Sequence, residues 1–125
     1  MAFIEKSVFF PTPALDGFYA VYMASRGGEA LAVITIDQGV IRGAGLDATC
    51  YDGSLSSAVD GFVVSLHVSV PAELSLVQGG SSGSDGQNFV VSFRLPSDFA
   101  QRDFISIETP HGLVNAKFRR LRGLK

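Results

Sequence analysis

Residue types that often cross-link a fold or form active sites are scarce in this chain of 125 residues. A single cysteine, Cys50, cannot form an internal disulfide, so nothing in the chain depends on an oxidising compartment. There is no tryptophan, and His67 and His111 are the only histidines. No apolar run reaches the roughly 18 residues of a membrane-spanning helix. We therefore expect a cytoplasmic protein that does not enter a membrane.

Positive charge is also limited, because ten Lys and Arg against twelve Asp and Glu give a net charge of −2. That balance excludes an overall basic field for nucleic acid, so no nucleic-acid partner is expected. Half of the positive charges lie in the last nine residues, 117–125. This basic C-terminus is interpreted as a solvated strand face, with contact to an anionic partner as the alternative.

Catalytic and metal-binding patterns are missing as well. The two histidines lie in different predicted hairpins without further ligands at metal-site spacing, so no metal and no cofactor are expected. Cys50 has no neighbouring base and is interpreted as an apolar strand filler. Asp47, Asp52 and Asp60 are interpreted as turn formers. The sequence therefore predicts a protein that is not an enzyme.

One glycine motif needs a separate test. Residues 43–48 match the letters G-x-G-x-x-A of a dinucleotide-binding fingerprint. That motif requires a helix directly after the glycines, whose N-terminus receives the pyrophosphate. Here residues 49–53 have the character of a strand followed by a bend, so the glycines are interpreted as a turn.

Four Asp-Gly pairs and alternating apolar residues predict antiparallel hairpins. Asp-Gly tolerates the positive φ angles of tight turns. The clearest alternation runs over residues 62–70 and 87–95, whereas the Gly/Ser-rich stretch 79–86 has the composition of a mobile loop. A helical turn capped by Ser97 is expected at 96–101. The expected strands are 15–24, 29–36, 40–42, 49–56, 62–70, 87–95, 104–109 and 113–121, with Gly43 to Gly45 breaking the third.

Eight short strands without a helical period predict an all-β fold. We expect an eight-stranded antiparallel up-and-down β-barrel of lipocalin-like shape, since closure removes exposed strand edges. The barrel-interior lining is expected to be bulky, which favours a largely filled centre. The predicted inward residues are Phe62, Leu66, Phe89, Phe93, Ile105, Ile107 and Phe118.

The chain is divided into a leader, residues 1–14, and a single barrel domain, residues 15–125. The leader is too short and too interrupted for a signal peptide. It is interpreted instead as an aromatic patch that packs on the domain or on a second subunit. Its apolar residues are Phe3, Ile4, Val8, Phe9 and Phe10.

Six short motifs follow one another in a recognisable order. They are Asp16-Gly17-Phe18-Tyr19, Gly39-Val40-Ile41-Arg42-Gly43, Tyr51-x-Gly53-x-Leu55-Ser56, Leu66-His67-Val68, Val91-x-Phe93-x-Leu95-Pro96 and Gly112-x-Val114-x-Ala116-Lys117-Phe118. Together they cover about residues 15–121 and resemble the GrlR-like family, named for a negative regulator of type III secretion.

The resemblance implies a small, cytoplasmic, dimeric lipocalin-like barrel without catalysis. Members of that family bind a transcriptional activator through an acidic run after the Leu-Ser pair, and here Asp60 is the one acid of that turn. The expected function is a regulatory barrel that acts by protein association, as a homodimer and with a regulatory protein partner. The alternative is a lipocalin-like binder of a small apolar ligand.

Overall fold

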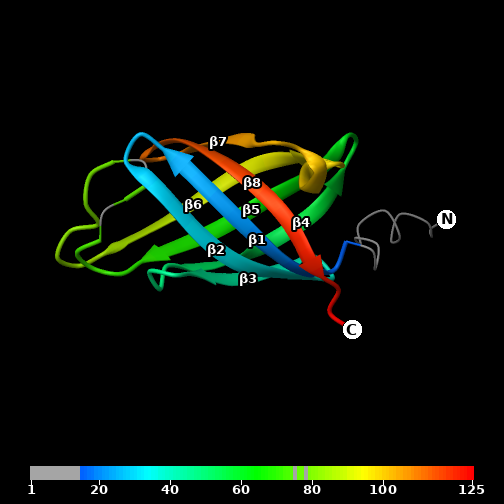
Figure 1. Ribbon diagram of the computed structural model, residues 1–125, viewed down its shortest axis with the longest axis horizontal. Coiled ribbons are helices and arrows are strands. Elements are labelled where there is room, and N and C mark those ends of the chain that lie inside the picture. Colours follow the sequence, from blue (N-terminus) through cyan, green and yellow to red (C-terminus); the bar gives the residue numbers. More distant parts are fainter. Residues whose placement is uncertain (1–14, 75, 78) are drawn as a thin grey trace.

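The computed structural model describes residues 15–125 except residues 75 and 78. In this part of the chain, eight antiparallel strands form one sheet that curls into a nearly closed barrel (Figure 1). The predicted all-β, up-and-down barrel is therefore confirmed. The elements are β1 (Gly17–Ser25), β2 (Gly28–Asp37), β3 (Val40–Gly45), β4 (Cys50–Ala58), β5 (Gly61–Val70), β6 (Gln87–Pro96), a 3₁₀ turn η1 (Phe99–Gln101), β7 (Ile105–Thr109) and β8 (Gly112–Arg122).

Period-two alternation places one side of every strand inside the barrel. On β5 the apolar set Val64, Leu66 and Val68 points inward, and the unbroken pairing with β6 sets Leu66 opposite Val91. The opposite set, which includes His67, is exposed. Because side chains alternate between the two faces, this register buries the apolar residues of β5 and β6 together.

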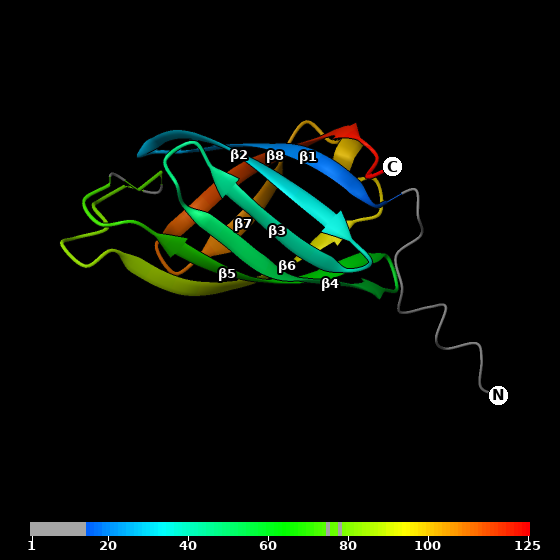
Figure 2. The same cartoon turned by 90° about the horizontal axis from the view of Figure 1, so that it is seen from below.

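Two inward glycines act differently from the sequence-based expectation. The predicted break at Gly43 is wrong, because β3 continues to Gly45 and pairs with both β2 and β4 (Figure 2). The bend expected near Gly53 does not interrupt β4, because Gly53 lies in an unbroken register with β5. A Cβ atom at Gly53 would lie 2.1 Å from the Ser65 carbonyl oxygen. Glycine is thus required where neighbouring strands of a tightly curved sheet approach one another.

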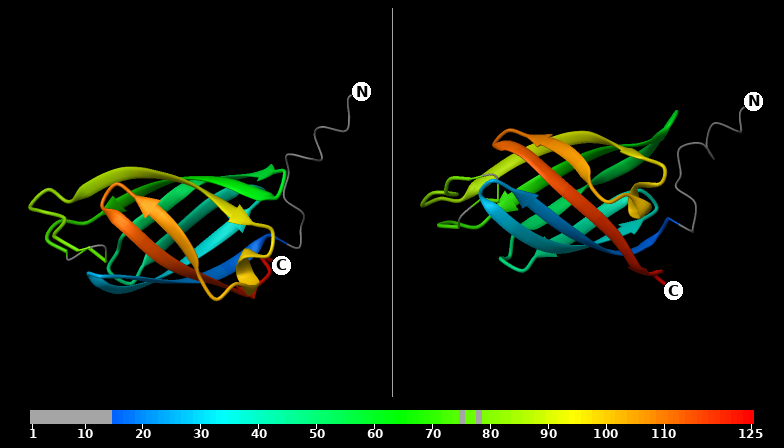
Figure 3. Two further views of the ribbon diagram at one scale, coloured as in Figure 1. Left: turned by 90° about the horizontal axis from the view of Figure 1, so that it is seen from above. Right: turned by 45° about the horizontal axis from the view of Figure 1, so that its top comes forward.

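The barrel has one seam without a hydrogen-bonded ladder. The strand order runs β6-β5-β4-β3-β2-β1-β8-β7, so β6 and β7 are the two edges of the described sheet. These edges nevertheless adjoin, as the yellow and orange strands in Figure 3 show. Closure therefore depends on side chains across the seam and on the 97–104 connection between the two strands.

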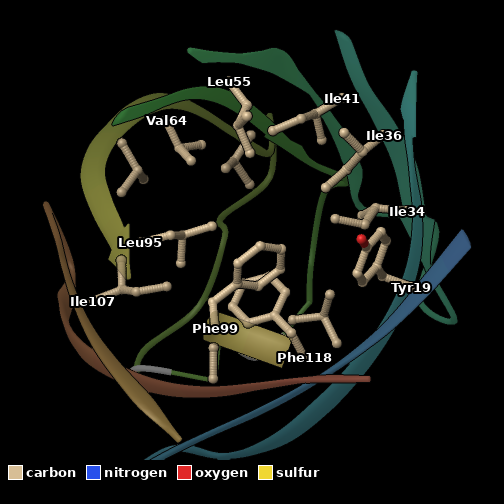
Figure 4. Packing of buried hydrophobic residues seen from close by; sticks show 14 of the residues in the cluster. Tyr19, Ile34, Ile36, Ile41, Leu55, Val64, Leu95, Phe99, Ile107 and Phe118 are labelled. Carbon is tan, nitrogen blue, oxygen red and sulfur yellow. The ribbon is translucent and has the colours of Figure 1, made fainter. Parts of the chain in front are cut away.

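That connection carries the aromatic plug of the barrel. The expected helical turn is present as η1, but its N-cap is Asp98 rather than Ser97. Phe99 is 2% exposed, and its ring centroid lies 5.7 Å from that of Tyr19, 6.0 Å from Phe62 and 5.4 Å from Phe118. In Figure 4 the Phe99 and Phe118 side chains lie next to each other inside the ring of strands, beside η1. We call the cluster of Phe99, Tyr19, Phe62 and Phe118 the aromatic plug, and the end of the barrel that contains it the plug end.

The β5–β6 connection lies at the opposite end, which we call the loop end, together with the β1–β2, β3–β4 and β7–β8 turns (Figure 1). Its Gly/Ser-rich part consists of bends and turns that hydrogen bonds hold in place. Ser82 is 1% exposed, and its Oγ accepts from the Leu74 backbone N–H at 2.8 Å and donates to the Pro71 carbonyl at 2.7 Å. The Gly27 N–H donates to the Val77 carbonyl at 2.8 Å. The Ser82 bonds fix the connection internally, and the Gly27–Val77 bond joins it to the β1–β2 turn.

Candidate functional site: an apolar cavity inside the barrel

A cavity of about 270 Å³ lies inside the barrel, lined by residues from all eight described strands. Most of the lining is aliphatic or aromatic, contributed by the buried core. The cavity begins at Phe118 of the plug and continues along the barrel to the loop end, where Gly27, Asp47 and Thr49 line it. Leu76 and Val77 of the β5–β6 connection also line it there. This is a small pocket by the standard of ligand sites, which typically begin near 300 Å³.

Small inward residues make this space. Ala30, Ala32 and Ala116 line the cavity, and Gly43 and Gly53 stand on the inner faces of β3 and β4. The expectation of a largely filled interior is wrong because it weighed only the bulky inward residues. The sequence signal that this expectation left out is the set of alanine and glycine residues at inward positions of β2, β3, β4 and β8.

The structure divides the predicted lining residues into two groups. Leu66, Phe89, Phe93 and Phe118 line the cavity. Phe62 packs edge-on against Phe99, at the plug end. The bulky residues thus close one end of the barrel and form part of the cavity wall.

Tyr51 is a polar group that the prediction did not include. It lies on the inner face of β4, opposite Gly43 and Val68, and lines the cavity. Its hydroxyl donates to the Met23 Sδ at 4.0 Å, and a thioether is a weak acceptor. Burial, with the Asp47 carboxylate as a second cause, raises the pKa of Tyr51 to about 12. The phenol therefore stays protonated and can donate or accept a hydrogen bond inside an apolar wall.

Asp47 and Thr49 come from the β3–β4 turn at the loop end. The Asp47 Oδ1 accepts the Thr49 backbone N–H at 3.0 Å, which fixes the turn and the carboxylate together. Thr49 is 4% exposed, whereas Asp47 is exposed. Asp47 was interpreted as a turn former, and the structure adds that it lines the cavity.

The remaining predicted residues lie apart from the cavity or at its edge. Cys50 is exposed on the outer face of β4, so its interpretation as an apolar filler is wrong. His111 is half-buried, with its ring centroid 4.8 Å from that of Phe89. This contact crosses the seam between β6 and the β7–β8 turn.

Asp60 is exposed in the β4–β5 turn at the plug end. The leader residues named above lie outside the described residues. Among the described residues, no group of three or more His, Cys, Asp or Glu side chains is placed to hold a metal ion.

No protein-family model, curated protein or solved structure matches this chain. Within the described residues, no helix has the length and apolarity to cross a membrane.

The raised pKa of Tyr51 has a measurable consequence. The protonated phenol is favoured in the folded state, so its contribution to stability is complete below pH 10 and is lost as the pH rises toward about 12. The loss is on the order of 2 kcal/mol in the free energy of unfolding. Phenolate absorbance should show a transition near pH 12 that is missing in Tyr51→Phe. An identical titration in that variant would contradict the assignment.

Proposed function

We propose that this protein is a non-enzymatic barrel that binds one small apolar ligand in its cavity. The observation that carries this proposal is the 270 Å³ space between apolar walls that continues to the loop end. An empty apolar space is costly, because the atoms that line it lose packing contacts. A ligand of matching shape restores those contacts and releases its own apolar surface from water.

The size of the space limits the ligand. An apolar cavity of about 150 Å³ holds one benzene molecule. Scaling from that case, the present cavity suits a ligand of about ten non-hydrogen atoms. That range includes a short alkyl chain or a substituted aromatic ring and excludes a large lipid held entirely inside the barrel.

The chemistry of the lining supports binding rather than catalysis. The side chains with polar groups, Glu29, Asp47, Thr49, Tyr51 and Thr109, lie among many more apolar ones. A catalytic centre needs a nucleophile or base within hydrogen-bond distance of a partner that orients it. The contacts of Tyr51 and Asp47 described above do not form such an arrangement.

Association with a second copy of the chain is a second proposed function, supported by the outer surface. Tyr22 is 48% exposed and Val33 is 41% exposed, although both belong to central strands of the sheet. Val33 pairs with Ala20 and Ala44 on the same outer face. Exposed apolar side chains on an outer face, here beside Lys117 and Arg119 of β8, can form part of a self-complementary dimer contact.

The ligand-binding proposal is tested by filling the cavity. Butylbenzene should bind with a dissociation constant on the order of 10 to 100 µM by isothermal titration calorimetry. Ala30→Leu places three more carbon atoms beside the cavity and should weaken binding at least tenfold. Ala44→Leu, the same change on the outer face, should bind like the wild type. Equal binding by both variants, or none by the wild type, would contradict the proposal.

The association proposal is tested by a charge on the outer face. Val33→Asp should shift the sedimentation equilibrium of a dimer toward monomer, because a carboxylate in an apolar contact loses its hydration. Ser65→Asp, on the exposed outer face of β5, serves as the matched control. A wild-type protein that is monomeric at all concentrations would rule out this second function.

A further inference from the structure

Acidic residues outnumber basic residues at the loop end. In the described residues, the turns and strand ends there carry one arginine, Arg26. The acidic residues of the same region are Glu29, Asp47, Glu73, Asp85 and Glu108. A ligand that enters the barrel at this end therefore passes a negative field.

Asp47, the acidic side chain that lines the cavity, forms no salt bridge within the described residues. It lines the cavity from the β3–β4 turn, and no lysine, arginine or histidine among the described residues does so. Glu29 borders the cavity too, but it pairs with Ala24 on the outer face, so its carboxylate points away from the interior. The salt bridge found among the described residues joins Arg102 to Asp98 at the plug end. Asp47 accepts a hydrogen bond from its own turn, but no cationic side chain in the described part of the chain pairs with its negative charge.

Asp47 and Tyr51 act on the same part of the cavity. Both residues line the cavity, and Tyr51 is the second residue of β4, directly after the turn that holds Asp47. The Asp47 carboxylate is also the second cause, after burial, of the raised pKa of Tyr51. Tyr51 lies on the inner face of β4. In the described residues, the Met23 thioether is the only hydrogen-bond partner of its hydroxyl. A ligand head group at this position finds a phenol that can accept or donate and a carboxylate that can accept.

We infer that the cavity selects its ligand by the head group, taking a short amphipathic molecule whose head donates hydrogen bonds, best a primary ammonium, and rejecting free carboxylates. This inference rests on the proposed function, since it assigns a chemical class to the ligand of the same cavity. The apolar body lies between the strands, and the head lies at Asp47 and Tyr51.

The physical reason is the local field. A carboxylate head at Asp47 places two like charges together at the end of an apolar cavity, which is unfavourable. An ammonium head replaces part of its hydration with a charge-assisted hydrogen bond to Asp47 and a second bond to the Tyr51 oxygen. A hydroxyl head makes the same two contacts without the charge and falls between the other two.

The test compares three ligands with one alkyl chain, octylamine, 1-octanol and sodium octanoate, by calorimetry at pH 7. With the wild type, octylamine should bind at least threefold more tightly than 1-octanol, and octanoate at least tenfold more weakly. Asp47→Asn keeps an oxygen that can accept the Thr49 N–H but removes the charge. It should reduce the ratio of octylamine to octanoate affinity about tenfold. Asp60→Asn, the same change at the plug end, should leave that ratio unchanged.

Two outcomes separate this inference from the proposed function. If butylbenzene binds but octanoate binds as tightly as 1-octanol, or Asp47→Asn leaves the ratio unchanged, head-group selection is wrong and the apolar site stands. If neither butylbenzene nor any octyl ligand binds, the cavity is not a ligand site and both proposals are overturned.

Discussion

The packing of Phe99 is the interaction on which the rest of the barrel depends. An eight-stranded sheet can close by hydrogen bonds at every interface, but here the β6–β7 interface has no ladder. The connection between these strands places Phe99 against Tyr19 of β1, Phe62 of β5 and Phe118 of β8. Each aromatic pair adds roughly 0.5 to 1.5 kcal/mol beyond simple burial. One ring thus joins strands from both sides of the seam and closes the plug end.

The plug also determines where space remains. Large side chains crowd the plug end, whereas Ala30, Ala32 and the inward glycines leave the middle and the loop end hollow. The β5–β6 connection then covers part of the opening with Leu76, held through the Gly27–Val77 hydrogen bond. The result is an apolar chamber with one closed end and one acidic end, which is the arrangement expected for an amphipathic ligand.

The strands could be predicted from sequence because their signals are local. Alternation over residues 62–70 and the Asp60-Gly61 turn need no knowledge of distant contacts. The cavity could not be predicted in the same way, because it depends on which inward residues meet across the barrel. Gly43 was misread for the same reason, since a glycine that allows close strand contact has the local signature of a break. Tyr51 was missed because a single tyrosine in a strand is most often a packing residue.

A hollow apolar chamber lies between the Phe99 plug and the loop end of the barrel. The most direct measurement is a crystal structure of the protein under xenon pressure, because xenon occupies apolar cavities without needing any specific head group. The account predicts xenon density inside the barrel, between Ile34 and Ile36 of β2 and Val64 and Val68 of β5. Side chains meeting across the barrel with no xenon between them would contradict it.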